Sequence, residues 1–287
     1  MRAHLVVAIL LSTAFATGTA ALSAQSVPPA VGSLPGDTLL SASAPLFTVR
    51  DAGIAAGFVG ATIALFPVDE RISKRLQRPS AQNNRFFRHA SKGFEQLAVP
   101  GAYIIGGSVY VVGRLSHQPR VADLGLHTTE AVLIATGVTG VLKGAFGRAR
   151  PYVSADTNSH DFKFGAGFGD DSRRAFPSGH STTAFAAAAA VTSEVHRSWP
   201  GRWWSTWLVG PAMYGGATMV GLARIYHDDH WASDVALGAA VGTFGGMKVV
   251  QYSHAHPHNF IDGVLLHTSL VPDGRGGVFL GWSNAAR

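Results

Sequence analysis

The sequence predicts an all-α protein, a six-helix bundle followed by a short C-terminal β-hairpin. Of its 287 residues, 47% are apolar and only 14% are charged, so the chain can bury a sizeable core. Six apolar stretches have helical length, and proline, glycine or capping residues lie near their ends. No internal repeat and no Rossmann-like glycine pattern is present, so nothing in the sequence suggests a second architecture.

The segment before the bundle has the pattern of an export signal. Arg2 and His4 give a positive start, an apolar core runs over residues 5–11, and small residues follow. This pattern predicts a signal peptide cleaved between Ala20 and Gln25, with an uncleaved membrane anchor as the alternative. The predicted division is a signal peptide at 1–25, a Pro/Ser/Gly-rich linker at 26–46, a helical domain at 47–253 and a tail at 254–287.

The six helices are expected near residues 51–66, 97–113, 127–148, 180–196, 204–223 and 230–251. Pro67 and Pro100 lie near helix ends, Thr128 begins a segment that can cap the third helix, and Pro200-Gly201 separates the fourth helix from the fifth. The basic segment between the first two helices, residues 67–96, is interpreted as a loop.

The tail changes character after Pro257. Residues 264–269 and 277–282 alternate like two strands around the turn Pro272-Asp273-Gly274, which predicts the hairpin. Three alternating histidines precede it: His254, His256 and His258. We interpret them as a linker into the hairpin, with a His-rich metal-binding tract as the alternative.

Charge and cysteine content limit the partners and the compartment. The net charge of +6 favours anionic partners, which include phosphate esters, lipid headgroups and nucleic acid. The absence of cysteine excludes a disulfide framework and a lipid-modified N-terminal cysteine, and export without disulfides suits a bacterial periplasm. Most predicted helices are near or below the roughly 20 residues that cross a bilayer. A periplasmic domain is therefore preferred over a polytopic membrane protein, although the basic 67–96 segment fits a cytoplasmic loop.

Three clusters of polar residues carry the candidate chemistry. The first is Lys143-Gly-Ala-Phe-Gly-Arg-Ala-Arg150-Pro151, in which Lys143 and Arg150 are seven residues apart. On a helix ended by Pro151 they would share a face and could bind one anion between them. A basic helix end that interacts with the helix dipole is the plain alternative.

The second cluster, Phe176-Pro177-Ser178-Gly179-His180, opens an alanine-rich helix. Ser178 is a candidate N-cap, Gly179 lets a ligand approach the backbone, and free N–H groups at a helix start bind anions. His180 would lie in the first turn, where it can exchange a proton with a bound ester. An ordinary cap with an incidental histidine is the alternative.

The third cluster runs from Arg224 to Asp234 and contains His230. His230 and Asp234 have i, i+4 spacing, so a shared helix face would let the carboxylate orient the imidazole. A surface His–Asp pair is the alternative. His227, Asp228 and Asp229 resemble metal ligands, but adjacent carboxylates are more often capping or solvated, and Asp229 is a candidate N-cap.

The three clusters together resemble the signature of the type 2 phosphatidic acid phosphatase superfamily, which includes class A acid phosphatases and vanadium haloperoxidases. The resemblance covers residues 127–240 and rests on Lys-x6-Arg-Pro, Pro-Ser-Gly-His and Arg-x5-His-x3-Asp. Ala223 replaces the serine that usually precedes the third-motif arginine, which removes one hydroxyl from the phosphate site.

The resemblance implies a six-helix bundle of the acid phosphatase/haloperoxidase type and a metal-independent phosphatase without a cofactor. His230 would be the nucleophile, oriented by Asp234, and His180 the general acid and base. The phosphate would be bound by Lys143, Arg150, Ser178, Gly179 and Arg224. Its substrate would be a lipid phosphate, an isoprenyl pyrophosphate or a small soluble ester, and its site would lie outside the cytoplasm.

Two other functions fit parts of the sequence. A vanadium-dependent haloperoxidase would hold vanadate on His230 in the same cradle, but the sequence offers no second feature for halide oxidation. A non-enzymatic helical module that binds anionic lipid explains the charge but not the spacing of His180, His230 and Asp234. Membrane association fits either the lipid phosphatase or this module, whereas nucleic acid is not an expected partner.

Overall fold

The computed structural model describes residues 45–153, 158–257, 259–260, 262–263, 268–272 and 278–282, with side chains up to Gly263. The predicted signal peptide and nearly all of the predicted linker lie outside the described residues, as do His258 and the tip of the predicted hairpin turn.

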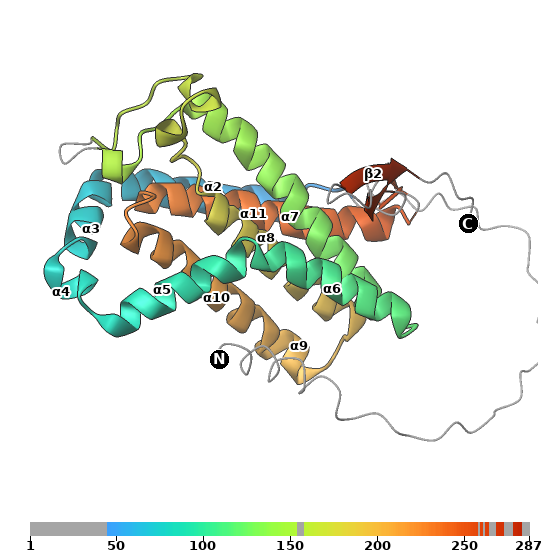
Figure 1. Ribbon diagram of the computed structural model, residues 1–287. Helices are drawn as coiled ribbons and strands as arrows, with labels where there is room; N and C mark the ends of the chain where they lie inside the picture. The colour runs from blue at the N-terminus through green and yellow to red at the C-terminus, as the bar shows by residue number, and fades with distance from the viewer. Residues whose placement is uncertain are drawn as a thin grey trace, which may run out of the picture. The chain divides into compact units, whose positions relative to one another are not determined.

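Helices make up most of the described chain, and Figure 1 shows their arrangement. Their bounds are α2 Val49–Leu65, α3 Asp69–Leu76, α4 Pro79–Gln82, α5 Arg85–Ala98, α6 Gly101–Leu115, α7 Pro119–Phe146, α8 Gly179–Ser198, α9 Trp203–Trp207, α10 Val209–Tyr226 and α11 Ala232–Ala255.

The main differences from the sequence prediction lie between the first two predicted helices and at helix ends. Residues 67–96 are not a loop, because they hold α3, α4 and most of α5, and the Asn84 side chain caps α5 through the N–H groups of Phe86 and Phe87. The third helix begins earlier, at Pro119, so Thr128 lies inside it. The last helix begins at Ala232 with Trp231 as its N-cap, which corrects the assignment of that role to Asp229.

Helix α8 lies between α7, α10 and α11, and its closest packing is against α11. Small residues permit this approach. A Cβ atom on Gly242 would lie 2.3 Å from the Thr182 carbonyl oxygen, and one on Gly246 would lie 2.5 Å from that of Ala186. The buried core between these helices is correspondingly built from alanine and valine, including Ala131, Val132, Ala186, Ala190, Val249 and Val250.

The outer helices carry apolar side chains on their exposed faces. Examples are Ile63 on α2, Ile104 on α6 and Val141 on α7. Two helical segments, Val49–Leu76 and Pro119–Phe146, are long and apolar enough to cross a bilayer, and α5 with α6, bent by 49°, would be a third. The chain is thus a membrane protein with two to three candidate spans, and the polytopic alternative is favoured over a purely periplasmic domain.

The tail contains strands β1 Thr268–Pro272 and β2 Val278–Trp282, which pair antiparallel with Leu270 opposite Leu280. Residues 264–267 of the predicted first strand lie outside the described residues. Helix α11 continues through Ala255, so His254 is helical and the interpretation of this residue as part of a linker is wrong.

Candidate active site

The end of α7 places Lys143 and directs the chain that follows it. Gly147 has the left-handed conformation (φ 59°) and donates its N–H to the Lys143 carbonyl oxygen at 3.2 Å, which ends the helix at Phe146. A Cβ atom at Gly147 would lie 1.9 Å from the Lys163 carbonyl oxygen, so glycine is required there. Arg150 therefore lies beyond the helix, and the prediction that Lys143 and Arg150 share a helix face is wrong.

The start of α8 lies directly against Lys143. Ser178 is the N-cap and its hydroxyl accepts from the Ser181 N–H, as predicted. A Cβ atom on Gly179 would be 3.4 Å from Lys143 Cε, so the lysine side chain passes over the backbone at this helix start. An ammonium group beside free helix N–H groups makes this position favourable for an anion.

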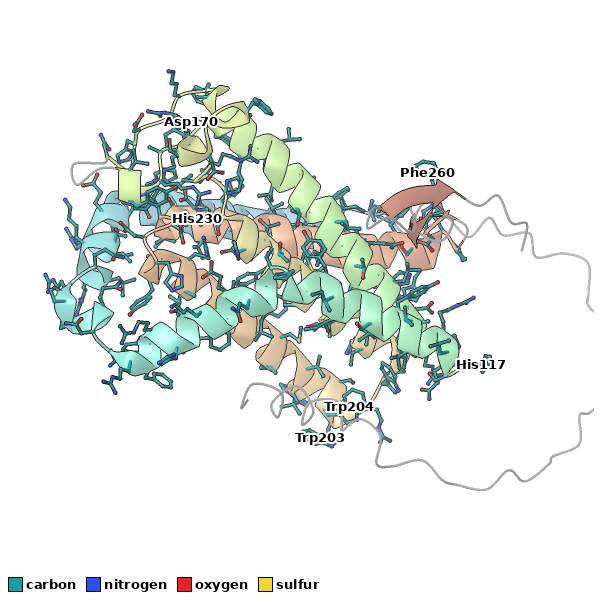
Figure 2. The ribbon with its side chains drawn as sticks, in the orientation of Figure 1. His117, Asp170, Trp203, Trp204, His230 and Phe260 are labelled. Atoms are coloured by element: carbon teal, nitrogen blue, oxygen red, sulfur yellow. The ribbon has the colours of Figure 1, made fainter. Side chains whose placement is uncertain are left out.

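His230 lies at the same end of the helical unit as Asp170, away from Trp203 and His117 (Figure 2). Its side chain is only 2% exposed, and its Nδ1 lies 2.7 Å from the Ala175 carbonyl oxygen. A carbonyl oxygen only accepts, so Nδ1 carries the proton and Nε2 keeps a free lone pair. No described residue donates a hydrogen bond to Nε2.

The electrostatic environment keeps both histidines neutral. Burial lowers the pKa of His230 well below its usual value, and the positive charges of Lys143, Arg224 and Arg150 lower it further. Burial also lowers the pKa of His180 to about 4, with Arg224, Lys143 and Arg150 acting in the same direction. The three predicted cations therefore act on both predicted histidines, although Arg224 is more than 70 positions away from Lys143 and Arg150 along the chain.

The predicted hydrogen bond between His230 and Asp234 is not present. His230 precedes α11, and its Nδ1 is 3.6 Å from Asp234 Oδ2, which is an ion-pair distance. Asp234 Oδ2 instead accepts from the Trp231 N–H at 2.7 Å. Orientation of the imidazole thus comes from the Ala175 carbonyl group, and Asp234 supplies a nearby negative charge.

Behind Asp234 lies a buried ionic network centred on Arg148, whose side chain is 0% exposed. Arg148 Nη1 donates to Asp234 Oδ1 at 2.5 Å and to Ser233 Oγ at 2.7 Å, and its Nη2 donates to Asp69 Oδ2 at 2.8 Å. Asp69 also accepts from the Ser233 N–H at 2.9 Å. The network joins α3, the segment after α7 and the first turn of α11, and so fixes the backbone that carries His230.

Carboxylates lie against the two arginine cations of the pocket. Arg224 pairs with Glu95 of α5 through Nη1 and with Asp229 at 2.8 Å through Nη2. Arg150 lies 3.6 Å from Asp229 and 3.4 Å from Asp171. Glu95 is also 3.9 Å from Nε2 of His180. A phosphate group that enters this pocket must therefore replace carboxylate oxygens around both guanidinium groups.

Comparison with known proteins agrees with this geometry. Residues 125–257, which carry all three clusters, match the family model described as the PAP2 superfamily. This segment belongs to the PAP2 superfamily. Over 110 residues, 38% of the chain, it is 37% identical to the lipid A 1-phosphatase of Porphyromonas gingivalis, and it spans only 19% of that relative's length.

Two solved structures are similar to this PAP2 chain. The transmembrane PAP2-type phosphatidylglycerolphosphate phosphatase of Bacillus subtilis matches 73% of this chain and 98% of its own, with a TM-score of 0.53 and 20% identity. The Aquifex aeolicus LpxE structure matches 64% of this chain and 93% of its own, with a TM-score of 0.41 and 20% identity. The first of these matches supports a PAP2-type fold.

The structure adds four residues to the PAP2 site that the sequence analysis did not select: Asp69, Glu95, Arg148 and Ala175. Two of them carried a usable signal. Arg148 lies within the first cluster, between Lys143 and Arg150, and Glu95 is the one acidic residue in the otherwise basic segment that forms α5. Asp69 and Ala175 carried none, because their roles arise from contacts with residues 79 and 55 positions away.

Replacing Arg148 with methionine is expected to destabilise the fold by about 3–5 kcal/mol, because it leaves the buried carboxylates of Asp69 and Asp234 unpaired. Thermal unfolding of the detergent-purified variant measures this. Arg173→Met is the matched control, since it breaks the partly exposed pair with Asp161 and should cost less than about 1 kcal/mol. Equal stability of the two variants would contradict the structural role of Arg148.

Proposed function

We propose that this PAP2 protein is a metal-independent phosphatase that hydrolyses phosphate monoesters through a phosphohistidine intermediate on His230. The observation that carries the proposal is the state of that imidazole. It is neutral, its Nδ1 proton is directed to Ala175, and its basic Nε2 lies in the field of Lys143, Arg150 and Arg224. Phosphoryl transfer needs a positioned nucleophile and fixed positive charge, and three side-chain cations supply that charge without Mg²⁺.

In the first step, His230 Nε2 attacks phosphorus in line with the leaving oxygen. The P–N bond forms as the P–O bond breaks, and His180 gives its proton to the departing alkoxide. The three cations, the Ser178 hydroxyl and the Gly179 N–H stabilise the equatorial oxygens, while Asp234 stabilises the imidazolium. In the second step, His180 takes a proton from water, the water oxygen attacks phosphorus, and the P–N bond breaks.

The low pKa of His180 has a consequence for pH dependence. With a pKa of about 4 in the free site, His180 is neutral above that pH, so its catalytic proton must arrive with the substrate. The monoanion of a phosphate ester carries this proton. The ester loses the proton, and the monoanion becomes scarce, above the second pKa of the ester, which is about 6. We therefore expect kcat/KM to fall about tenfold per pH unit above pH 6.

A pH profile of kcat/KM measured with two esters of different second pKa checks this expectation. The alkaline limb should move with the substrate's pKa, because the titrating group belongs to the substrate. A flat profile between pH 6 and 9 would show that His180 receives its proton in another way, and a limb that is identical for both esters would assign the titration to a group of the protein.

A lipid phosphate is the substrate class that we infer. Phe86 and Phe87 are exposed on α5, the same helix that brings Glu95 to Arg224, so this helix presents apolar side chains that a lipid can contact. The similar proteins described above act, by their names, on lipid A and phosphatidylglycerolphosphate. Export and a site on the outer side of the membrane are part of this proposal and follow from the predicted signal peptide.

The test is phosphate release from phosphatidic acid, undecaprenyl pyrophosphate and p-nitrophenyl phosphate, with and without detergent and EDTA. We expect release that EDTA does not inhibit and a higher kcat/KM for a lipid ester than for p-nitrophenyl phosphate. Loss of activity with EDTA would contradict metal independence. A preference for the soluble ester in detergent would contradict the lipid assignment but leave the chemistry intact.

A further inference from the structure

A second group of titratable side chains lies far from the phosphatase pocket. It consists of His127 and Glu130 on α7, Glu194 on α8, His254 on α11 and Asp262 after α11, and we call it the distal cluster. Along α11, twenty residues separate His254 from Asp234, which corresponds to about 30 Å at 1.5 Å per residue. The distal cluster therefore takes no part in the chemistry at His230.

Glu194 is bonded to both histidines of the distal cluster. Its Oε2 lies 3.1 Å from His127 Nδ1, and both of its carboxylate oxygens lie 2.9–3.0 Å from His254 Nε2. The two rings meet edge to face with centroids 5.1 Å apart. Two imidazole nitrogens thus converge on one buried carboxylate from two different helices.

Glu130 is the second unusual member of the distal cluster. Its side chain is fully buried, and among the described residues its Oε1 has no hydrogen-bond partner. Its Oε2 accepts a long bond of 3.4 Å from Ser253, and the Glu130 side chain shares a hydrogen bond with that of Asp262. Glu130 and Asp262 also place an oxygen each within 4.8 Å of one another and of a His127 nitrogen. Adjacent carboxylates in a buried site repel each other unless a proton or a cation lies between them.

We propose that the distal cluster binds a divalent transition-metal ion of the Zn²⁺ class through His127, His254 and Glu194, whose ligand atoms all lie within 4.8 Å of one another. Two imidazoles with carboxylates suit Zn²⁺ better than Mg²⁺ or Ca²⁺, which prefer oxygen ligands alone. Ligands about 2.0–2.1 Å from a tetrahedral ion lie about 3.3 Å apart, close to the separations of Glu194 from both histidines.

Glu130 and Asp262 share a side-chain hydrogen bond, so they form a separate pair beside the three proposed ligands. A cation bound by the two imidazoles and the Glu194 carboxylate would join α7, α8 and α11 at the end opposite the pocket. Binding would displace the imidazole protons that now point to Glu194.

A rival metal site exists beside the pocket, formed by Glu95, His227 and Asp229. Its two carboxylates already pair with Arg224, so the negative charge that would hold a cation there is neutralised. His227 also bonds to Ser91 and Glu95. The distal cluster has no arginine or lysine partner among the described residues, which favours it as the cation site.

The test uses the full chain in detergent, purified through a tag without histidine, stripped with a chelator and titrated with Zn²⁺ alone. We expect one Zn²⁺ per chain and a rise in the melting temperature on binding. His254→Gln should weaken binding at least about 10²-fold and remove the melting shift. His256→Gln is the matched control, because His256 is exposed and stacks on Tyr252, and it should bind like wild type.

Glu194→Gln provides a second, isosteric variant if His254→Gln does not fold. It should also reduce the Zn²⁺-induced melting shift, because Glu194 lies between both histidines. Equal Zn²⁺ binding by wild type and either variant would overturn the proposal. Loss of binding in His227→Gln with retention in His254→Gln would also overturn it, by assigning the metal to the rival site.

Discussion

Replacing His230 with alanine is expected to reduce turnover by more than about 10³-fold while the protein remains folded. The reason is that a covalent mechanism has no substitute nucleophile in the pocket, and among the described residues the imidazole has one hydrogen-bond partner, the Ala175 carbonyl oxygen. Losing that bond leaves a buried carbonyl group unpaired, which costs about 1–3 kcal/mol.

Steady-state phosphate release, together with a melting curve, measures both effects. His196→Ala is a matched control, because His196 is exposed in the last turn of α8, at the end away from the pocket, and should keep wild-type turnover. A folded His230→Ala protein that retains more than about a tenth of wild-type turnover would exclude His230 as the nucleophile.

Replacing His180 with alanine is expected to separate substrates by their leaving groups. An alkyl phosphate releases a strongly basic alkoxide that must be protonated in the transition state, whereas p-nitrophenolate departs without help. General acid catalysis contributes typically 10²–10⁴-fold where it is needed. The variant should therefore form the phosphoenzyme far more slowly from an alkyl or lipid phosphate and only mildly more slowly from p-nitrophenyl phosphate.

Steady-state rates would hide this difference, because His180 is also expected to activate the water of the second step. A single-turnover burst isolates the first step: the variant should release p-nitrophenol quickly and then stall. If the burst slows equally for both esters, His180 only maintains the pocket. The His180 side chain is 25% exposed, and its Nε2 lies 3.9 Å from Glu95. Glu95→Gln therefore tests whether the Glu95 carboxylate contributes to the burst.

Local spacing predicted features of the structure where a motif carried its own geometry. Ser178 is the N-cap of α8, and Lys143, Arg150 and Arg224 all act on His230. The predicted shared helix face of Lys143 and Arg150 was wrong. Lys143 and Arg150 meet the same histidine because the chain turns at Gly147, not because they share a helix face.

The features that sequence missed depend on contacts between distant residues. Asp69 bonds to Arg148, 79 positions away in the sequence, and Glu95 bonds to Arg224, 129 positions away. Both acidic residues belong to the segment 67–96, which was predicted to be a loop because it is basic. A basic segment with few large apolar runs gives a weak helical signal, although tertiary packing makes it α3 to α5. His254 was misassigned for the same reason, because its partner Glu194 lies 60 positions away.

The identity of the phosphorylated atom is the most direct test of the account. His180→Ala protein is mixed with p-nitrophenyl phosphate, quenched in alkali to preserve a P–N bond, and digested for mass spectrometry. Phosphate is expected on His230, in an amount equal to the p-nitrophenol burst. Phosphate on any other residue, or a burst without phosphoenzyme, would contradict it.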